Sequence, residues 1–392
     1  MTPTYIIEEK LLRQNLQLIQ QVQQQTGAQF ILALKAFALW KTFPIFRQYI
    51  NATTASSTYE AILATQKFGT KTHTYTPAYN QQNIKTLAKL SSHLTFNSIT
   101  QAQQYAHIAQ KINPDISIGI RINPEFSTVK TQQYNPCTTG SRFGITQQQL
   151  PKQLPTYIQG FHCHNHCEST AEEFQQTLQH ITQKFQHWLP KLKWINFGGG
   201  HLVTHKNYNQ KLLIQLLNNF KKQYPNLQLI LEPGSAFLWQ TGTLVAQVND
   251  IVTQHNIKTA ILNVSFACHM PDTLEMPYKP QVKNAKTINT PLQNNQTTNP
   301  PNNQTTNPPN NQTTYRLAGN SCLAGDYIDA YQFDHQLQIG ENIIFQDMIH
   351  YTTVKTHMFN GLQHPDIAIL HTNGQLETLR HFTYQDYLNR MD

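Results

Sequence analysis

The chain has 392 residues, enough for two domains, with a net charge of +8 and 39% hydrophobic residues. Its lysines and arginines occur singly or in pairs such as Lys221-Lys222, so no basic block indicates a nucleic-acid partner. No apolar stretch is long enough to span a bilayer, so we expect no membrane partner. The five cysteines form no CxxC pair, and the first residues lack a signal-peptide pattern. These features predict a reduced, cytoplasmic protein.

The first informative element is an apolar run over residues 30–40, in which Lys35 is the only charged residue. Burial disfavours the ammonium form, so a lysine held by a buried strand tends to have a lowered pKa and an amine available to a carbonyl group. This chemistry suits a lysine that forms a Schiff base. The alternative is a lysine at a strand end whose head group reaches water.

Strand-like and helix-like segments alternate through the first two-thirds of the chain, which is typical of a parallel α/β fold. Isoleucine at every second position from 116 to 122 predicts a strand, with Arg121 near its end. The sequence Ser-Thr-Ala-Glu at 169–172 reads as a capping box, and apolar residues at helical spacing follow it as far as Trp188. We therefore expect a helix that begins directly after Ser169.

Predicted strands at 193–197 and 227–231 flank a helix that contains Leu213 and Phe220. They form a β-α-β unit. Repetition of such units predicts a barrel or a doubly wound sheet.

Three glycines, Gly198, Gly199 and Gly200, directly follow the first of these strands. Glycines let backbone N–H groups surround a phosphate, although a tight turn is the alternative. Glu232 ends the second strand and so places a carboxylate at the mouth of the predicted barrel.

His162, His164 and His166 alternate along another predicted strand and point to one side of it. Three histidines can bind zinc, but their spacing along a strand separates the side chains by about 7 Å. Hydrogen-bonded pocket histidines are the favoured interpretation, and we expect no metal. One imidazole could also stack on an aromatic cofactor.

From about residue 240 the pattern changes to short β-branched runs at 241–251, 260–264 and 341–355, which predict an all-β domain. Residues 290–314 are rich in Asn, Thr and Pro and contain a repeat, so we predict a disordered insert there. In the same domain, Cys322 and Asp326 share a glycine-containing loop. Tyr351 carries a hydroxyl that could bind phosphate, although a core tyrosine is the plain alternative.

Together these segments resemble the fold-type III pyridoxal-phosphate decarboxylases, the family of ornithine, diaminopimelate and arginine decarboxylases. The resemblance covers nearly the whole chain. It implies an α/β fold, with a (β/α)8 TIM-like barrel of the alanine racemase type over residues 1–240, whose first strand can pack with the second domain. The C-terminal β domain would cover residues 241–392 and contain the insert at 290–314.

The resemblance also implies roles for individual residues around pyridoxal 5'-phosphate. Lys35 would bind the cofactor covalently, His164 would stack on its ring, and Glu232 would pair with its ring nitrogen. Gly198, Gly199, Gly200 and Tyr351 would bind its phosphate. Cys322 and Asp326 would complete the active site of the neighbouring subunit in a homodimer, with Cys322 returning a proton to the substrate carbon.

Within the family, residues 269–278, 322–326 and 350–361 are similar to the branch that decarboxylates carboxynorspermidine and carboxyspermidine to norspermidine and spermidine. The expected substrate is therefore a small cationic amino acid, a carboxylated polyamine. Its amines would need carboxylates, for which the candidates are Glu232, Asp272, Glu275 and Asp326. Leu323 stands where the ornithine and diaminopimelate enzymes have an acidic residue, which argues against those substrates. A non-catalytic regulator that pairs with another subunit is the alternative of a different class.

Overall fold

The structure is a computed structural model that describes residues 1–276, 278–288 and 313–392. The chain forms two compact units: residues 13–239, here called the barrel unit, and residues 1–12 with 240–392, here called the β unit. The sequence predicted a division into 1–240 and 241–392. Residues 1–12 group with the later part of the chain because their strand pairs with two strands of the β unit.

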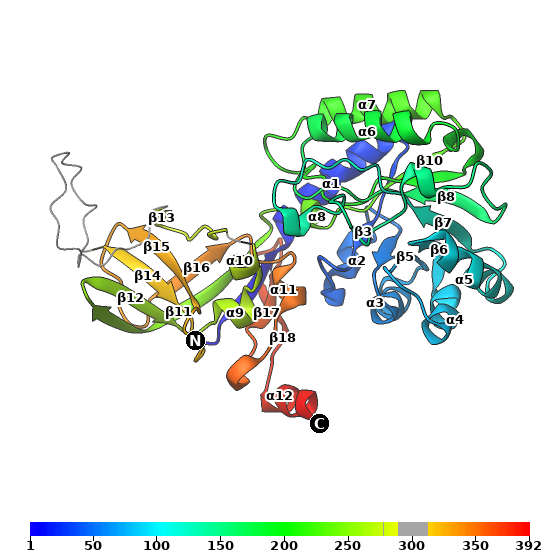
Figure 1. The fold of residues 1–392 in the computed structure, drawn as a ribbon. Helices are drawn as coiled ribbons and strands as arrows, with labels where there is room; N and C mark the ends of the chain where they lie inside the picture. The colour runs from blue at the N-terminus through cyan, green and yellow to red at the C-terminus, as the bar shows by residue number, and fades with distance from the viewer. Residues whose placement is uncertain (277, 289–312) are drawn as a thin grey trace. The chain divides into compact units, whose positions relative to one another are not determined.

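The barrel unit is a closed parallel sheet surrounded by helices (Figure 1). Strands β2 (Gln29–Phe30) and β3 (Leu32–Ala33) are two parts of one strand interrupted at Ile31. Ile31 donates its N–H to Leu231 O at 2.9 Å on one side, and Leu32 donates to Ala52 O at 3.2 Å on the other. This strand therefore joins the two ends of the sheet, which confirms the predicted barrel. The other strands, in chain order, are β4 (Thr53–Ala55), β5 (Thr72–Tyr75), β6 (Ser91–Phe96), β7 (Ser117–Arg121), β8 (Ile158–His162), β9 (Trp194–Asn196) and β10 (Gln228–Leu231).

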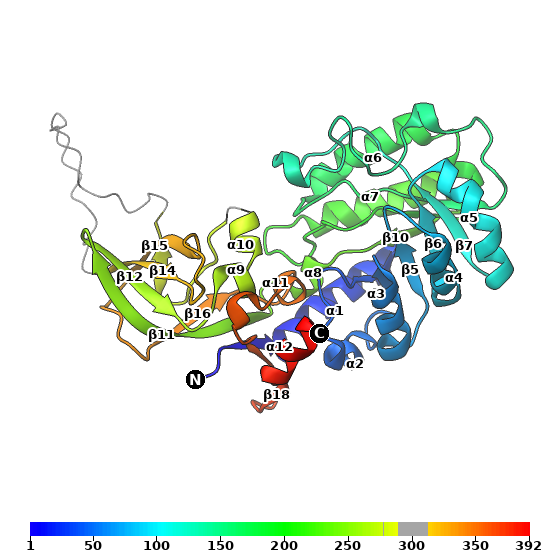
Figure 2. The ribbon, with the colours of Figure 1, turned by 60° about the horizontal axis from the view of Figure 1, so that its bottom comes forward.

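Helices cover the outside of the barrel, and α6 and α7 lie side by side there (Figures 1 and 2). On α6, apolar residues recur at helical spacing and are buried, as the sequence predicted. The helix begins one residue later than expected, because Thr170 is the N-cap and forms the capping box with Glu173. The helices associated with this unit are α1 (Glu9–Thr26), α2 (Phe43–Phe46), α3 (Thr58–Leu63), α4 (Gln81–Leu90), α5 (Ile99–Ile112), α6 (Ala171–Phe185), α7 (Gln210–Gln223) and α8 (Ser235–Leu238).

Trp194 fills one end of the barrel interior. It is the first residue of β9, packs with Ile31, Ala52 and Ile230, and lies so close to Gly160 that a Cβ there would collide with the indole. The indole N–H is satisfied by Ser117 Oγ at 2.8 Å. The Trp194 side chain thus fills the barrel at the N-terminal end of the parallel strands. An active site is therefore expected at the opposite end, where the strands have their C-termini.

The β unit contains a mixed sheet in which β1 pairs antiparallel with β11 and parallel with β17. Its strands are β1 (Thr4–Glu8), β11 (Gly242–Gln254), β12 (Ile257–Leu262), β13 (Ala285–Thr287), β14 (Thr314–Ala318), β15 (Tyr327–Phe333), β16 (Asn342–Gln346), β17 (Asp366–Leu370) and β18 (Leu376–Arg380). Short helices lie between them or at the end of the chain, namely α9 (Phe266–His269), α10 (Asp272–Glu275), α11 (Thr352–Lys355) and α12 (Tyr384–Met391).

The sequence-based expectations were wrong about three details. The strand expected over 341–355 ends at Gln346, because the next residue, Asp347, has a positive φ of 59°, and the chain then turns into α11. Thr314, placed in the predicted insert, begins β14, whereas residues 290–312 lie outside the described residues. The apolar run around Lys35 leaves the strand at Ala33 and continues as turns. Among the helices that the structure describes, none has the length and apolar character needed to cross a membrane.

Candidate active site

Four predicted site segments meet at the C-terminal ends of the barrel strands. Lys35 lies two residues beyond β3, His164 two beyond β8 and Gly198 two beyond β9, and Glu232 directly follows β10. In a parallel barrel these ends share one face, where the active sites of such barrels are found. The structure therefore brings together Lys35, His164, the glycine turn and Glu232.

Lys35 and His164 are in direct contact, with 3.1 Å between Lys35 Nζ and His164 Nε2. The other ring nitrogen, His164 Nδ1, accepts the backbone N–H of Gly199 at 3.0 Å. A neutral imidazole has one donor and one acceptor nitrogen, so its proton must be on Nε2. Nε2–H then donates to Lys35, and only a neutral amine can accept it. The two hydrogen bonds of His164 can therefore form together only when Lys35 is unprotonated.

The electrostatic environment agrees with this assignment. Burial lowers the pKa of Lys35; the negative charge of Glu232 opposes this shift, and the positive charge of Arg121 adds to it. Burial also lowers the pKa of His164, and the nearby charges of Lys35 and Arg121 contribute in the same direction. Both shifts favour the neutral forms of these two groups.

Glu232 is buried and ionised. His162 Nε2 donates to its Oε1 at 3.1 Å, and Asn196 Nδ2 donates to its Oε2 at 2.9 Å. Burial by itself would raise the pKa of Glu232, but the interactions with His162, Lys35 and Asn196 lower it to about 2. The site therefore contains a fixed negative charge able to accept a hydrogen bond from a cationic ring nitrogen.

The glycine turn packs so closely against its neighbours that it has no room for side chains. Gly198 and Gly200 have φ values of 73° and 89°, which favour glycine. A Cβ on Gly198 would lie 2.6 Å from His164 Cβ, and one on Gly199 would lie 2.6 Å from Glu232 O. The N–H groups of Gly198 and Gly199 already donate to Asn196 Oδ1 and His164 Nδ1. Within the described residues no acceptor is found for the third amide, that of Gly200.

The three alternating histidines have different partners. His162 contacts Glu232, His164 contacts Lys35, and His166 Nδ1 lies 3.0 Å from Ser169 Oγ. No group of three or more possible metal ligands is found among residues 1–276, 278–288 and 313–392. The alternation along the strand therefore does not bring these side chains to one point.

Sequence reasoning missed the supporting roles of three residues. His162 and Asn196 hold Glu232, and Arg121 donates to His164 O at 2.9 Å while its guanidinium lies 4.8 Å from the ring centre of Tyr75. Arg121 could have been suspected, because it is a charged residue at the end of an isoleucine-rich strand. The contacts of His162 and Asn196 with Glu232 depend on strands far apart in the sequence.

The remaining candidates lie in the β unit. Cys322 is exposed, with its backbone N–H bonded to Asn360 Oδ1 at 2.7 Å, whereas Asp326 is buried within the same loop. Asp272 and Glu275 on α10 both form ion pairs with Lys355, the last residue of α11. These two predicted substrate carboxylates thus already bind an ammonium group.

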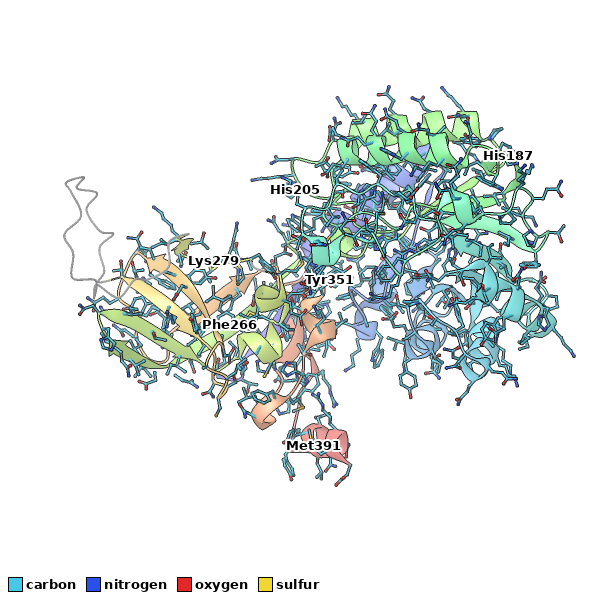
Figure 3. All side chains as sticks on the ribbon, viewed as in Figure 1. His187, His205, Phe266, Lys279, Tyr351 and Met391 are labelled. Atoms are coloured by element: carbon cyan, nitrogen blue, oxygen red, sulfur yellow. The ribbon has the colours of Figure 1, made fainter. Side chains whose placement is uncertain are left out.

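Tyr351, the predicted phosphate-binding tyrosine, directly precedes α11 (Figure 3). It is partly buried, and its φ of 54° is unusual for a tyrosine. Strained backbone of this kind persists where the surrounding structure enforces it and is frequent at functional sites.

Comparison with known proteins gives the family. The family model for "Pyridoxal-dependent decarboxylase, C-terminal sheet domain" matches residues 5–349. The chain therefore belongs to the family of pyridoxal-dependent decarboxylases, and its barrel and β unit agree with this.

Two curated relatives match almost the whole chain. A carboxyaminopropylagmatine decarboxylase from Synechocystis sp. is 42% identical over 390 residues, covering 100% of this chain and 95% of that protein. A carboxynorspermidine/carboxyspermidine decarboxylase from Campylobacter jejuni is 40% identical, covering 98% of this chain and 97% of that protein. The crystal structure of carboxynorspermidine decarboxylase from C. jejuni, complexed with norspermidine, has a TM-score of 0.88 and 38% identity and covers both chains completely. The protein is thus an enzyme, a decarboxylase, and uses pyridoxal phosphate.

The site fits this cofactor. A neutral, buried amine suits its carbonyl group, a cradle without side chains suits a phosphate, and a buried carboxylate suits a protonated ring nitrogen. When bound, pyridoxal phosphate accepts the electron pair that departing carbon dioxide leaves on the substrate.

Proposed function

We propose that the protein decarboxylates a carboxylated polyamine in polyamine biosynthesis, with Lys35, His164 and Glu232 at the centre of the site. The observation that carries this proposal is the contact between Lys35 Nζ and His164 Nε2 at 3.1 Å, in a site that also holds the buried carboxylate of Glu232. The substrate class is supported by the two relatives at 40% identity or more, since both act on carboxylated polyamines.

Each chain residue has a definite task in this mechanism. Lys35 Nζ would hold the cofactor through its carbonyl carbon. Glu232 would accept a hydrogen bond from the protonated ring nitrogen and stabilise its positive charge. His164 would contact the cofactor ring; its own orientation is fixed by Gly199 N–H and, through its carbonyl, by Arg121. Cys322 Sγ delivers a proton to the carbon that lost carbon dioxide.

Phosphate binding has two proposed contributors. The Gly198–Gly200 turn supplies close backbone approach and the Gly200 amide, and Tyr351 supplies a hydroxyl. Ser235 adds no positive charge after Glu232, so the phosphate would be held mainly by neutral donors.

We also propose that Asp272 and Glu275 receive the distal cationic group of the substrate. Their pairing with Lys355 shows that they can bind an ammonium group. Asp326, the third candidate, has a different environment, because its carboxylate accepts hydrogen bonds from its own loop.

A second substrate is favoured by one specific observation. The Synechocystis relative, which matches the full chain at 42% identity, acts on carboxyaminopropylagmatine. An agmatine derivative ends in a guanidinium instead of an ammonium group, and two neighbouring carboxylates suit its planar set of donors. Carboxynorspermidine, carboxyspermidine and carboxyaminopropylagmatine are therefore the candidate substrates.

We further propose that the enzyme is a cytoplasmic homodimer with shared active sites. All five cysteines lie in the described part of the chain and are thiols, not disulfides, which suits a reducing compartment. Cys322 is exposed on its loop and is therefore accessible to a neighbouring subunit.

The test is product formation with pyridoxal phosphate from these three substrates, diaminopimelate and ornithine in parallel. We expect the corresponding amine from at least one carboxylated polyamine and none from the other two. Turnover of diaminopimelate or ornithine alone would contradict the substrate class. No turnover of any of the five would favour the non-catalytic regulator.

A further inference from the structure

The Cys322 loop, defined here as residues 319–326, is built around the buried carboxylate of Asp326. This side chain accepts three hydrogen bonds: at Oδ1 from Ala267 N–H at 3.0 Å, and at Oδ2 from Ser321 N–H at 3.2 Å and Ser321 Oγ at 2.6 Å. Asp326 is only 3% exposed. The sequence analysis predicted that Asp326 binds the substrate. In the structure, its oxygens accept hydrogen bonds from the protein's own donors.

The loop backbone folds closely around this carboxylate. Gly319 N–H donates to Asp326 O at 2.7 Å, and a Cβ on Gly319 would collide with the Asp326 carboxylate. Asp326 N–H in turn donates to Leu323 O at 3.0 Å. The two ends of the loop are thus fixed to each other, with Cys322 and Leu323 at the exposed turn between them.

The same carboxylate joins this loop to a second proposed site segment. Ala267 lies in α9, which is followed directly by α10 with Asp272 and Glu275. Asn320 N–H reinforces the connection by donating to Val264 O at 2.8 Å. Asp326 therefore links the cysteine loop to the segment that carries the two carboxylates proposed to bind the substrate.

A residue outside the Cys322 loop also fixes the backbone of Cys322. Its backbone N–H donates to Asn360 Oδ1, and Asn360 has a left-handed φ of 58°. The cysteine thus has a defined backbone position while its side chain is exposed.

We propose that Asp326 is a positioning residue, not a substrate ligand: it holds Cys322 and the α9–α10 segment in a fixed relation to each other. Charge-assisted hydrogen bonds to a buried carboxylate are among the stronger ones in proteins, so a single side chain can order both segments. This inference rests on the proposed function insofar as Cys322 is taken as the proton donor.

The test compares D326N with D329N as a matched control. Asp329, in the same unit, pairs with Arg316 at 2.6 and 3.0 Å and contacts neither segment through its side chain. An asparagine at 326 can accept at one end only, so it leaves donors of Ser321 or Ala267 without an acceptor. Hydrogen–deuterium exchange in D326N should become about tenfold faster at the amide that is left without an acceptor, that of Ser321 or that of Ala267. It should be unchanged at these amides in D329N.

Kinetics with a carboxylated polyamine provide the second readout. We expect D326N to lower kcat about tenfold or more, because the proton donor is misplaced, and to raise KM as far as the α9–α10 segment with its two carboxylates shifts. In a C322A background, D326N should add little further loss, since both changes act on one step. A loss of kcat/KM that is fully additive with C322A, together with unchanged amide exchange, would instead make Asp326 a substrate ligand and overturn the inference.

A milder variant keeps the test decisive if D326N does not fold. S321A removes the Ser321 hydroxyl donor, and exchange at residues 319–326 should rise a few-fold. Unchanged exchange in S321A and in any folded D326N would overturn the inference. If the wild-type enzyme acts on no carboxylated polyamine, the proposed function fails, but the exchange experiment still decides whether Asp326 holds the loop.

Discussion

Nε2 of His164 lies 3.1 Å from Nζ of Lys35, and the opposite nitrogen of the same ring accepts the N–H of Gly199. Since the backbone amide can only donate, the ring must present its own N–H to the lysine. A single peptide group in the glycine turn thus determines the protonation of the lysine two residues beyond β3.

The first prediction concerns the pH dependence of cofactor binding. In the proposed mechanism Lys35 reacts with the cofactor as a neutral amine, and burial lowers its pKa from the ordinary 10.5. The rate at which cofactor-free enzyme binds pyridoxal phosphate should therefore reach its plateau well below pH 10. Stopped-flow absorbance measures this rate, with Nα-acetyl-lysine as the control. A rate that keeps rising about tenfold per pH unit up to pH 10 would show an ordinary lysine.

The second prediction concerns acid stability. The pKa of Glu232 is lowered to about 2, so its carboxylate stabilises the fold above pH 4.5, and this contribution is lost as the pH falls toward 2. The difference in unfolding free energy between wild type and E232Q should shrink by about 2 kcal/mol between pH 5 and pH 3. Urea titrations at both pH values measure it. A difference that does not change with pH would mean that Glu232 is not held ionised.

The third prediction concerns the glycine turn. In G198A, the new Cβ would lie 2.6 Å from His164 Cβ at a φ of 73°, so both strain and collision are expected. Cofactor affinity should fall about tenfold or more, and the free energy of unfolding should fall by about 2 kcal/mol. G140A is the control, because Gly140 has a φ of 76° but no atom within 4 Å of the position that a Cβ would take. Equal losses in both variants would assign the effect to backbone strain alone.

The fourth prediction concerns Lys355, the internal partner of Asp272 and Glu275. If these carboxylates receive the distal group of the substrate, Lys355 competes with it for them. K355M should therefore lower KM for carboxylated polyamines a few-fold, whereas D272N should raise it about tenfold. Because Lys355 is about one-third exposed, the stability cost of K355M should stay within about 1 kcal/mol. A raised KM in K355M would mean that the lysine positions these carboxylates for the substrate.

The sequence predicted those parts of the site that depend on local patterns. A charge in an apolar run, glycines after a strand and a carboxylate at a strand end located Lys35, the turn and Glu232, because the ends of parallel strands converge. It did not reveal that His162 donates to Glu232, since that contact joins residues 70 positions apart. It also could not show that Asp326 faces three internal donors, because a buried structural carboxylate and a ligand look alike in sequence.

Lys355 illustrates the same limit. Its partners Asp272 and Glu275 lie 83 and 80 positions away in the sequence, and the residues between them include the predicted insert. Only the fold of the β unit brings α10 and α11 together. By contrast, the β-α-β pattern of residues 193–231 was predictable, because its strands and helix depend on nearby residues.

The central claim is that Lys35 attaches the cofactor, and borohydride reduction of the loaded enzyme tests it most directly. Peptide mass spectrometry after reduction should find the pyridoxyl phosphate group on Lys35, and H164A or G198A should reduce the labelled fraction. Labelling at any other lysine, with Lys35 unmodified, would contradict the account.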